Sequence, residues 1–501
     1  MVFSSLEFIY LFLPPVLLVY LVLRALKLET GIILWLITAS LAFYAWWNPY
    51  YLLLLLGSVG FNYLVHKALI KTPSKTIFAF GTAVNLATLA LFKYADFLIE
   101  NVNSVAGLSI PHLDLILPLA ISFYTFQQIS FLHDTLVGKL VKCDFKRYVL
   151  FVTFFPQLIA GPIVMQKDTI PQFHMSNFSN KFVTNLLLGA TLFSIGLFKK
   201  IVLADSVAPL ANIVFTAADT GQDLTMAAAW TGSIAYTLQI YFDFSGYCDM
   251  ALGLALMFGI RLPMNFNSPY KALSIVDFWR RWHMTLSRFL RDYLYIPLGG
   301  NRSGLLGSKG NLMITMLLGG LWHGAGWNFV IWGGLHGGYL IANHFWSSST
   351  IGGGFKNLIG RHLYTVFAWS ITMLAVVIAW VFFRAETLPG ALTVLTAMAG
   401  LGSDVSMTTG KLFADGIYQT LMMFAVMFII VAFMPNSIQI TRSHRPIISA
   451  AGDVKKISGK LKSLRWSMSP QWATFTSVIF FVTVIQIYRL NGLTEFIYFN
   501  F

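Results

Sequence analysis

Long apolar runs recur along the whole chain, and short polar or basic connections separate them. A helix needs roughly 20 apolar residues to cross about 30 Å of hydrocarbon, and many of the runs approach this length. We therefore predict an all-α polytopic membrane protein with roughly eleven to thirteen membrane-embedded helices. The candidate spans are residues 7–25, 31–47, 51–67, 76–93, 113–132, 183–198, 226–243, 246–260, 311–346 (broken or unbroken), 362–383, 416–434 and 473–488.

Composition supports the membrane class. The 501 residues are 57% hydrophobic and 11% charged, whereas soluble domains carry about 25% charged residues. The net charge of +14 comes from lysines and arginines that cluster in connections, which predicts a bilayer and not a nucleic acid as the partner. By the positive-inside rule, the N-terminus lies outside and these basic connections face the cytoplasm: Arg24 and Lys27; Lys67, Lys71 and Lys75; Lys139 to Arg147; Arg442 to Arg465.

Polar segments at 162–182 and 261–310 interrupt the apolar blocks. They suggest parts of one membrane domain over 1–501 and not separable modules. We predict N-terminal helices over 1–112, a catalytic core over 113–346 and C-terminal helices over 347–501.

Carboxylates interrupt the apolar sequence between Tyr241 and Asp249. This segment closes one apolar run and opens another, and it brings Asp243 and Asp249 to membrane depth, where a carboxylate is costly without a partner. We expect both to pair with the arginines that follow residue 277, in preference to a direct part in chemistry. Gly246 permits a sharp turn or a close helix contact.

Residues 277–293 form a short, basic and aromatic-rich segment. The spacing of its aromatic residues predicts one helix at the cytoplasmic surface or in a cavity, on which His283 and Ser287 share a face. Its arginines either hold a phosphate-rich donor by bidentate contacts or anchor the helix to lipid phosphates; they are Arg280, Arg281, Arg288 and Arg291.

A glycine-rich stretch from Gly319 to Asn328 places Trp322 and His323 inside an apolar run. A histidine at membrane depth usually faces a cavity and not lipid, so His323 is a candidate functional residue. A neutral imidazole, with a pKa of about 6.5, is suited to taking a proton from a hydroxyl group. The glycines permit a helix break, and His336 beyond them is expected to be a core histidine.

The remaining histidines and the cysteines predict no metal site. Cys143 and Cys248 are isolated, and the histidines have none of the spacings of known metal motifs. We expect these histidines to be solvated or bonded in the core: His66, His112, His133, His174, His344, His362 and His444.

Several ordered motifs resemble the membrane-bound O-acyltransferase family, and within it the branch that acetylates bacterial exopolysaccharides such as alginate. They include Tyr-Phe-Asp-Phe-Ser-Gly-Tyr, Asn-Phe-Asn, Asp-Phe-Trp-Arg-Arg-Trp-His-Met-Thr-Leu-Ser and Leu-Trp-His-Gly-Ala, at 241–247, 265–267, 277–287 and 321–325. Further matches occur at 122–127, 154–162, 291–300 and 496–501.

The resemblance implies a fold whose helices surround a central tunnel, with His323 in the tunnel and His283 as the second signature residue on the cytoplasmic side. It implies an acyl donor that enters from the cytosol, expected to be acetyl-CoA, and no bound cofactor. It further implies a bacterial inner-membrane location, a polysaccharide acceptor and a periplasmic partner resembling an acetyl-esterase.

The expected activity is therefore transfer of an acetyl group across the membrane for O-acetylation of an exported polysaccharide. We expect His323 to act as general base, with His283 orienting the reactants or hydrogen bonding to the donor; a transient acyl-enzyme involving Ser287 is the alternative. Two other classes stay open at this point: a transporter or flippase, and a scaffold that recruits secreted enzymes. Within the family, peptidoglycan acylation and D-alanyl transfer are further alternatives.

Overall fold

The computed structural model describes residues 1–139, 143–179, 181–302, 304–404, 407–412, 416–448, 464–489 and 496–497. Every regular element in these ranges is a helix, and β-pairing there is limited to an isolated bridge between Pro263 and Ile448. The all-α prediction is confirmed. Most of the closing motif at 496–501 lies outside the described residues.

Within the described ranges, six helices are long and apolar enough to cross a membrane, which confirms a multi-pass membrane protein. A seventh span results if α21 (Ile417–Phe433) and the short helical segment Ser437–His444 count as one broken span. The predicted eleven to thirteen embedded helices also counted shorter elements such as Glu29–Ala45. The six are Glu7–Ala25, Pro49–Lys71, Lys75–Lys93, Phe182–Asp219, Gly360–Arg384 and Pro470–Arg489.

Two of the predicted spans, 226–243 and 246–260, are one continuous helix, α13 (Met226–Met257). The predicted division into two spans was therefore wrong, and of the two roles expected for Gly246 the sharp turn does not occur. Polar residues that suggested a break are buried instead: Asp243 is 1% exposed, Ser245 3% and Asp249 4%. The backbone N–H and C=O groups of a helix form hydrogen bonds within the helix itself. Polar side chains that have partners therefore need not interrupt it.

The described chain forms two compact units. The first contains residues 1–198, 246–264 and 437–500, and the second contains 199–245 and 265–436. The chain passes from the second unit to the first within α13. The division into 1–112, 113–346 and 347–501 stays a prediction.

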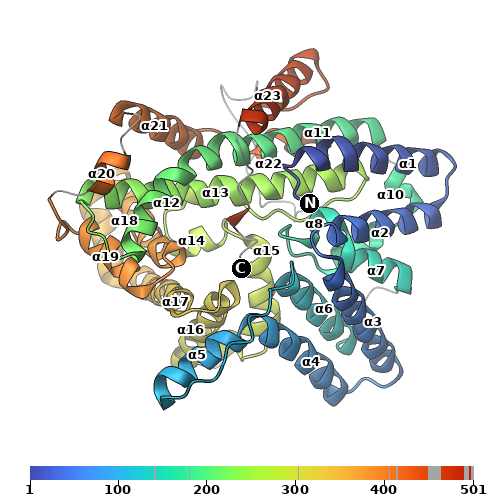
Figure 1. The fold of residues 1–501 in the computed structure, drawn as a ribbon, viewed down its shortest axis with the longest axis horizontal. Coiled ribbons are helices and arrows are strands. Elements are labelled where there is room, and N and C mark those ends of the chain that lie inside the picture. The colour runs from blue at the N-terminus through green and yellow to red at the C-terminus, as the bar shows by residue number, and fades with distance from the viewer. Residues whose placement is uncertain are drawn as a thin grey trace. The chain divides into compact units, whose positions relative to one another are not determined.

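The first unit is built mainly from its N-terminal helices, of which α2, α3 and α4 lie side by side (Figure 1). Caps fix several of their starts: Asn48 accepts a hydrogen bond from the amide of Tyr50, and Ser74 from that of Thr76. The elements of this unit are η1 (Glu7–Phe12), α1 (Leu13–Ala25), α2 (Glu29–Ala45), α3 (Pro49–Lys71), α4 (Lys75–Lys93), α5 (Ala95–Ala106), α6 (Ile121–Leu136), α7 (Phe145–Thr153), α8 (Phe155–Leu158), α9 (Gln166–Thr169), η2 (Ile170–Gln172), α10 (Met175–Ser179), α11 (Phe182–Phe198), α22 (Ser437–Thr441), η7 (Arg442–His444) and α23 (Pro470–Arg489).

The motifs at 122–127 and 154–162 meet in the core of this unit. The side-chain amides of Gln127 and Gln157 both donate to the carbonyl oxygen of Phe151, each at 2.8 Å. Both glutamines are buried and line one small pocket with Phe123 and Gly161. These hydrogen bonds join both α6 and α8 to the C-terminal part of α7.

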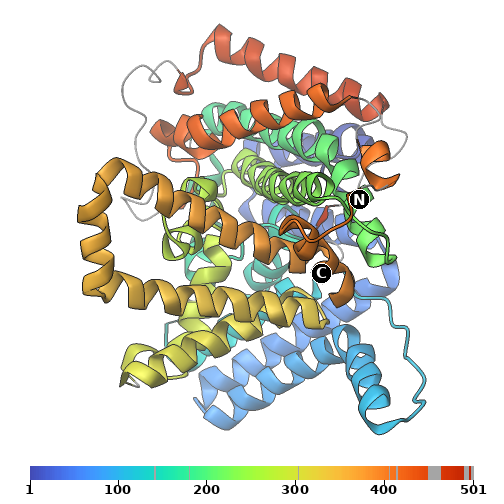
Figure 2. The ribbon, with the colours of Figure 1, turned by 90° about the vertical axis from the view of Figure 1, so that its left-hand side faces the viewer.

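The second unit stacks its helices as successive hairpins, and Figure 2 shows α16, α17 and the later part of α18 as neighbouring layers. Gly360, with φ of 76°, kinks α18. Besides the first part of α13, the elements are η3 (Lys199–Ala204), α12 (Asp205–Asp219), η4 (Pro269–Lys271), α14 (Ile275–Trp279), α15 (Met284–Leu290), η5 (Arg291–Tyr295), η6 (Gly300–Arg302), α16 (Gly304–His323), α17 (Trp327–Ser348), α18 (Thr350–Arg384), α19 (Leu388–Met398), α20 (Met407–Leu412) and α21 (Ile417–Phe433).

Close backbone contact joins α11 to the C-terminal part of α13. A Cβ atom added at Gly189 would lie 2.6 Å from the carbonyl oxygen of Gly253, and one at Gly253 would lie 2.5 Å from that of Gly189. Gly196 meets Gly246 in the same way. Small residues let two helices approach this closely in a membrane, so Gly246 serves helix packing.

We predict that Gly189→Ala lowers the stability of the protein by about 1–3 kcal/mol, because the added methyl group must push the two backbones apart. Gly57→Ala is the matched control: nothing lies within 4 Å of its added Cβ, so the change should be neutral or slightly stabilising. Thermal unfolding of both variants in detergent measures the difference. Equal midpoints for the two would contradict the described packing.

Candidate functional site

His323 is the last residue of α16, and the chain breaks at residues 324–326 before α17 begins at Trp327. Of the two possibilities left open for 311–346, the structure shows the broken form. Glycines allow the two helices to meet: a Cβ atom at Gly320 would lie 3.1 Å from the Cα of Gly333. The break is held further by Asn328, whose side-chain amide donates to the carbonyl oxygen of Ala385 at 2.8 Å.

Aromatic rings surround the His323 imidazole, which is 2% exposed. Its ring centroid lies 4.9 Å from Trp322, 5.0 Å from Trp332 and 5.1 Å from Phe383. These rings exclude bulk water and fix the orientation of the imidazole by edge-to-face contact. The tunnel expected around His323 stays a prediction.

His283 does not belong to a helix, so the prediction of one helix over 277–293 was wrong. Helix α14 ends at Trp279, α15 begins at Met284, and His283 between them has φ of 42°. Its relation to Ser287 is therefore not that of two residues on one helical face. A left-handed conformation at a residue other than glycine costs roughly 1–2 kcal/mol and is retained where surrounding contacts require it.

The contacts that require it come from Asn265. Backbone hydrogen bonds join residues 265–267 to the start of α15 and the segment before it. The amide of Asn267 donates to the carbonyl oxygen of Arg281, and the amide of Met284 donates to the carbonyl oxygen of Asn265. The Asn265 side-chain oxygen lies 3.0 Å from Nδ1 of His283. The Asn-Phe-Asn motif alone did not predict a role for Asn265, because its partner His283 lies 18 residues further along the chain.

The structure brings the two predicted histidines together. The ring centroids of His283 and His323 are 6.5 Å apart, and His283 also contacts the rings of Phe244 and Trp322. His283 is fully buried, and burial lowers its pKa to about 3. Two imidazoles at this separation, one of them held neutral, form a pair suited to moving a proton in a water-poor site.

The residues of the basic segment are more exposed than the histidines. Arg280 and Arg291 lie at the surface, and Arg281 and Arg288 are half-buried. Arg281 pairs with Asp277 at 2.8 Å, and Arg291 pairs with its neighbour Asp292 at 2.7 Å. A role for these arginines in donor binding stays a prediction.

Ser287 is tied to the backbone, since its hydroxyl group donates to the carbonyl oxygen of Trp279 at 3.3 Å. His336 is fully buried, accepts a hydrogen bond from the indole of Trp279 at 3.3 Å and stacks on Phe278. These are the contacts expected of a core histidine.

Asp243 pairs with a cation that sequence analysis missed. Nζ of Lys200 lies 2.6 Å from Asp243 and 2.9 Å from Asp205, and the lysine is 1% exposed. Lys200 lies in η3, a π-helical turn in which residues five apart align, and this brings Asp205 beside it. We expected the partner of Asp243 among the arginines after residue 277. Lys200, which lies within apolar sequence, was the signal that could have identified the partner.

Asp249 belongs to the first unit, where it accepts a hydrogen bond from the hydroxyl group of Ser437 at 2.7 Å. Its described contact there is therefore one of packing within the core.

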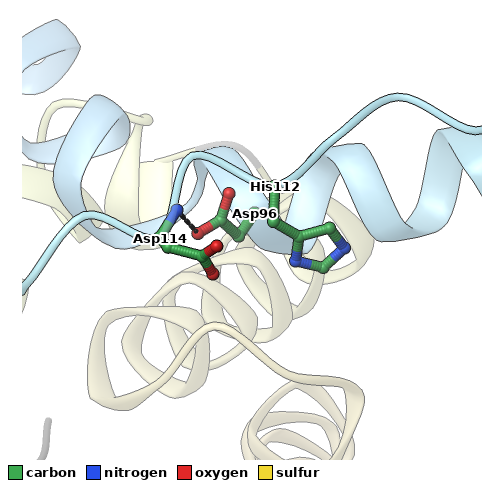
Figure 3. Close-up of side chains that lie close together, drawn as sticks. All are labelled: Asp96, His112 and Asp114. Carbon is green, nitrogen blue, oxygen red and sulfur yellow. Dashed lines mark hydrogen bonds between the residues drawn. The ribbon is translucent and has the colours of Figure 1, made fainter.

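Three metal-ligating side chains converge elsewhere in the first unit, between α5 and the loop after it (Figure 3). Asp96, His112 and Asp114 place one ligand atom each within 4.8 Å of one another. The Asp96 carboxylate accepts hydrogen bonds from the amides of Leu113 and Asp114, at 2.7 and 3.1 Å, so it also anchors the loop. The sequence suggested that His112 is isolated, whereas the structure places it beside two aspartates. The expectation that the protein binds no metal stays a prediction.

Comparison with known proteins identifies the relatives of the chain. The profile of the membrane-bound O-acyltransferase family matches residues 28–381. A peptidoglycan O-acetyltransferase of Helicobacter pylori is 46% identical over 80% of this chain and 80% of its own. A probable alginate O-acetylase AlgI of Pseudomonas aeruginosa is 43% identical over 80% and 76%. A teichoic acid D-alanyltransferase of Bacillus subtilis is 28% identical over 47% and 60%.

We predict that Lys200→Met destabilises the protein by about 3–5 kcal/mol, because it leaves two buried carboxylates without their cation. The double change Lys200→Met with Asp243→Asn should recover part of this loss by removing one of the two charges. Unfolding midpoints of the three proteins in detergent test the pair. A Lys200→Met protein as stable as the wild type would contradict the ion pair.

We further predict that stability falls as the pH is lowered from 7 to 5. The pKa of His283 is about 3 when folded and about 6.5 when unfolded, so in this range only the unfolded chain takes up the proton. The loss attributable to His283 is roughly 2 kcal/mol at pH 5.

Comparison of unfolding midpoints at the two pH values measures this effect. His283→Asn should remove this part of the pH dependence, whereas the same change at the exposed His362 should preserve it. An unchanged pH dependence in His283→Asn would contradict the neutral, buried state of this imidazole.

Proposed function

Because the chain belongs to the membrane-bound O-acyltransferase family, we propose that it acetylates hydroxyl groups of an exported polysaccharide. The chain is an O-acyltransferase, and its relatives at 41–46% identity over four fifths of the chain include proteins named for O-acetylation. The D-alanyltransferases match at 27–28% over less than half of it. This contrast favours acetyl over D-alanyl as the transferred group.

The observation that carries the proposal is the pair of buried imidazoles within an aromatic enclosure. In the proposed reaction, His323 takes the proton of an acceptor hydroxyl group, and the hydroxyl oxygen forms a bond to the acetyl carbonyl carbon. The bond from that carbon to the donor sulfur breaks, and the proton passes to the departing thiolate. Exclusion of water by the surrounding rings suppresses hydrolysis of the donor.

We propose acetyl-CoA as the donor, since a thioester supplies both the acetyl group and a good leaving group. It would approach from the cytosol, where the exposed Arg280 and Arg291 offer guanidinium groups to its phosphates. The location proposed is the inner membrane of a bacterium, and the proposed partner is a periplasmic acetyl-esterase-like acetyltransferase.

Two acceptor polymers are supported by the named relatives. Alginate follows from the AlgI proteins at 39–43% identity, and peptidoglycan from the Helicobacter pylori protein at 46%. The sequence identities to the two kinds of relative are close, so acetylation of both polymers is to be measured. A transporter or flippase would instead move its substrate in vesicles without consuming an acyl donor.

We predict that His323→Ala lowers polymer acetylation by at least about 100-fold while the protein still folds and inserts, because general-base catalysis contributes about 10²–10⁴. The measurement is mass spectrometry of acetyl esters in alginate and in peptidoglycan from cells with wild-type protein, with His323→Ala and with neither. The polymer whose acetylation depends on the protein identifies the acceptor. Normal acetylation by a well-inserted His323→Ala protein would overturn the proposal.

A further inference from the structure

The side-chain oxygen of Asn265 receives three hydrogen-bonding groups at once. The backbone amide of Thr285 donates to it at 3.3 Å, the hydroxyl group of Thr285 donates at 2.9 Å, and Nδ1 of His283 lies 3.0 Å away. Asn265 is 1% exposed and Thr285 is 4% exposed, so these contacts are made away from water.

The backbone amide decides which end of the Asn265 side chain faces the imidazole. An N–H group only donates, so the atom that it contacts must be the side-chain oxygen and not the side-chain nitrogen. That oxygen only accepts. The His283 nitrogen beside it must therefore carry a hydrogen, since two acceptors at 3.0 Å would repel each other.

A proton on Nδ1 leaves two states for His283: the neutral tautomer with its lone pair on Nε2, and the imidazolium. Burial favours the neutral ring, because taking the ring out of water disfavours its charged form and lowers the pKa of His283 to about 3. In the resting protein Nε2 thus carries a lone pair.

We infer that Asn265 is a positioning residue that fixes the tautomer of His283, so that His283 enters the transfer reaction as a hydrogen-bond acceptor through Nε2. This inference rests on the proposed function. It narrows the role of His283, because Nε2 can accept a proton or a hydrogen bond within the site but cannot donate a hydrogen bond to the carbonyl oxygen of the thioester.

The left-handed conformation of His283 supports this role. The residue is held there by Met284, whose amide donates to the backbone of Asn265 while the Asn265 side chain holds the ring. One residue thus fixes the backbone, the ring orientation and the protonated nitrogen. Strain retained at such a position is typical of sites where orientation matters more than stability.

Asn265→Asp separates positioning from mere packing. The carboxylate keeps the shape and accepts the same three groups, but its charge stabilises the imidazolium and raises the pKa of His283. We expect kcat/KM to fall on the acid side, with the acid limb of its pH profile at least one unit higher than in the wild type. At high pH, activity should return to within a few fold.

Asn267→Asp is the matched control, with the same substitution two residues away. The Asn267 side chain accepts from Asn436 at 3.3 Å, so its pH profile should keep the wild-type shape. A loss of activity in Asn265→Asp that is equal at every pH would indicate a structural role alone and would overturn the inference.

Nitrogen NMR of the protein with ¹⁵N-labelled histidine tests the tautomer without any assay of activity. The His283 signals are assigned by their loss in His283→Asn. Wild-type protein should show Nδ1 protonated and Nε2 unprotonated at pH 7, and Asn265→Asp should show the imidazolium as the pH is lowered. A hydrogen on Nε2 of the neutral ring would overturn the inference, whereas failure to transfer acetyl groups with an Nδ1–H tautomer would overturn only the proposed function.

Discussion

The hydrogen bond between Asn265 and His283 is the contact on which the arrangement of the site depends. A fully buried imidazole without a hydrogen-bonded N–H group would cost about 1–3 kcal/mol, and the rings of Phe244 and Trp322 pack against this one. The same amide oxygen also holds the first turn of α15 through Thr285. The start of the helix and the orientation of the ring are therefore set together.

Close helix packing places the second histidine. His323 ends α16, and its position is defined by how closely α16 and α17 approach where Gly320 faces Gly333. A Cβ atom at Gly324 would collide with the ring of Phe329. The glycines of the Trp-His-Gly-Ala-Gly segment thus serve mainly to bring aromatic rings around the imidazole, and the enclosure follows from backbone proximity.

Much of the fold could be predicted because its signals are local. Apolar runs predicted the helices, the glycines permitted the break at 324–326, and the cost of polar groups in a membrane made His323 a candidate functional residue. The errors arose where a partner lies far along the chain. Local polarity suggested two spans around Gly246 and one helix over 277–293, whereas Lys200 pairs with Asp243 and Asn265 holds His283 between two helices.

The type of reaction is easier to assign than the polymer that is acetylated. Relatives named for peptidoglycan and for alginate are almost equally similar to this chain, at 46% and 43% identity. The proposed reaction makes the same demands with both polymers: an acyl donor, a hydroxyl group, a proton acceptor and the exclusion of water. The chemistry proposed for the two histidines involves only the reacting groups, so we expect residues outside this enclosure, or a partner protein, to select between polymers.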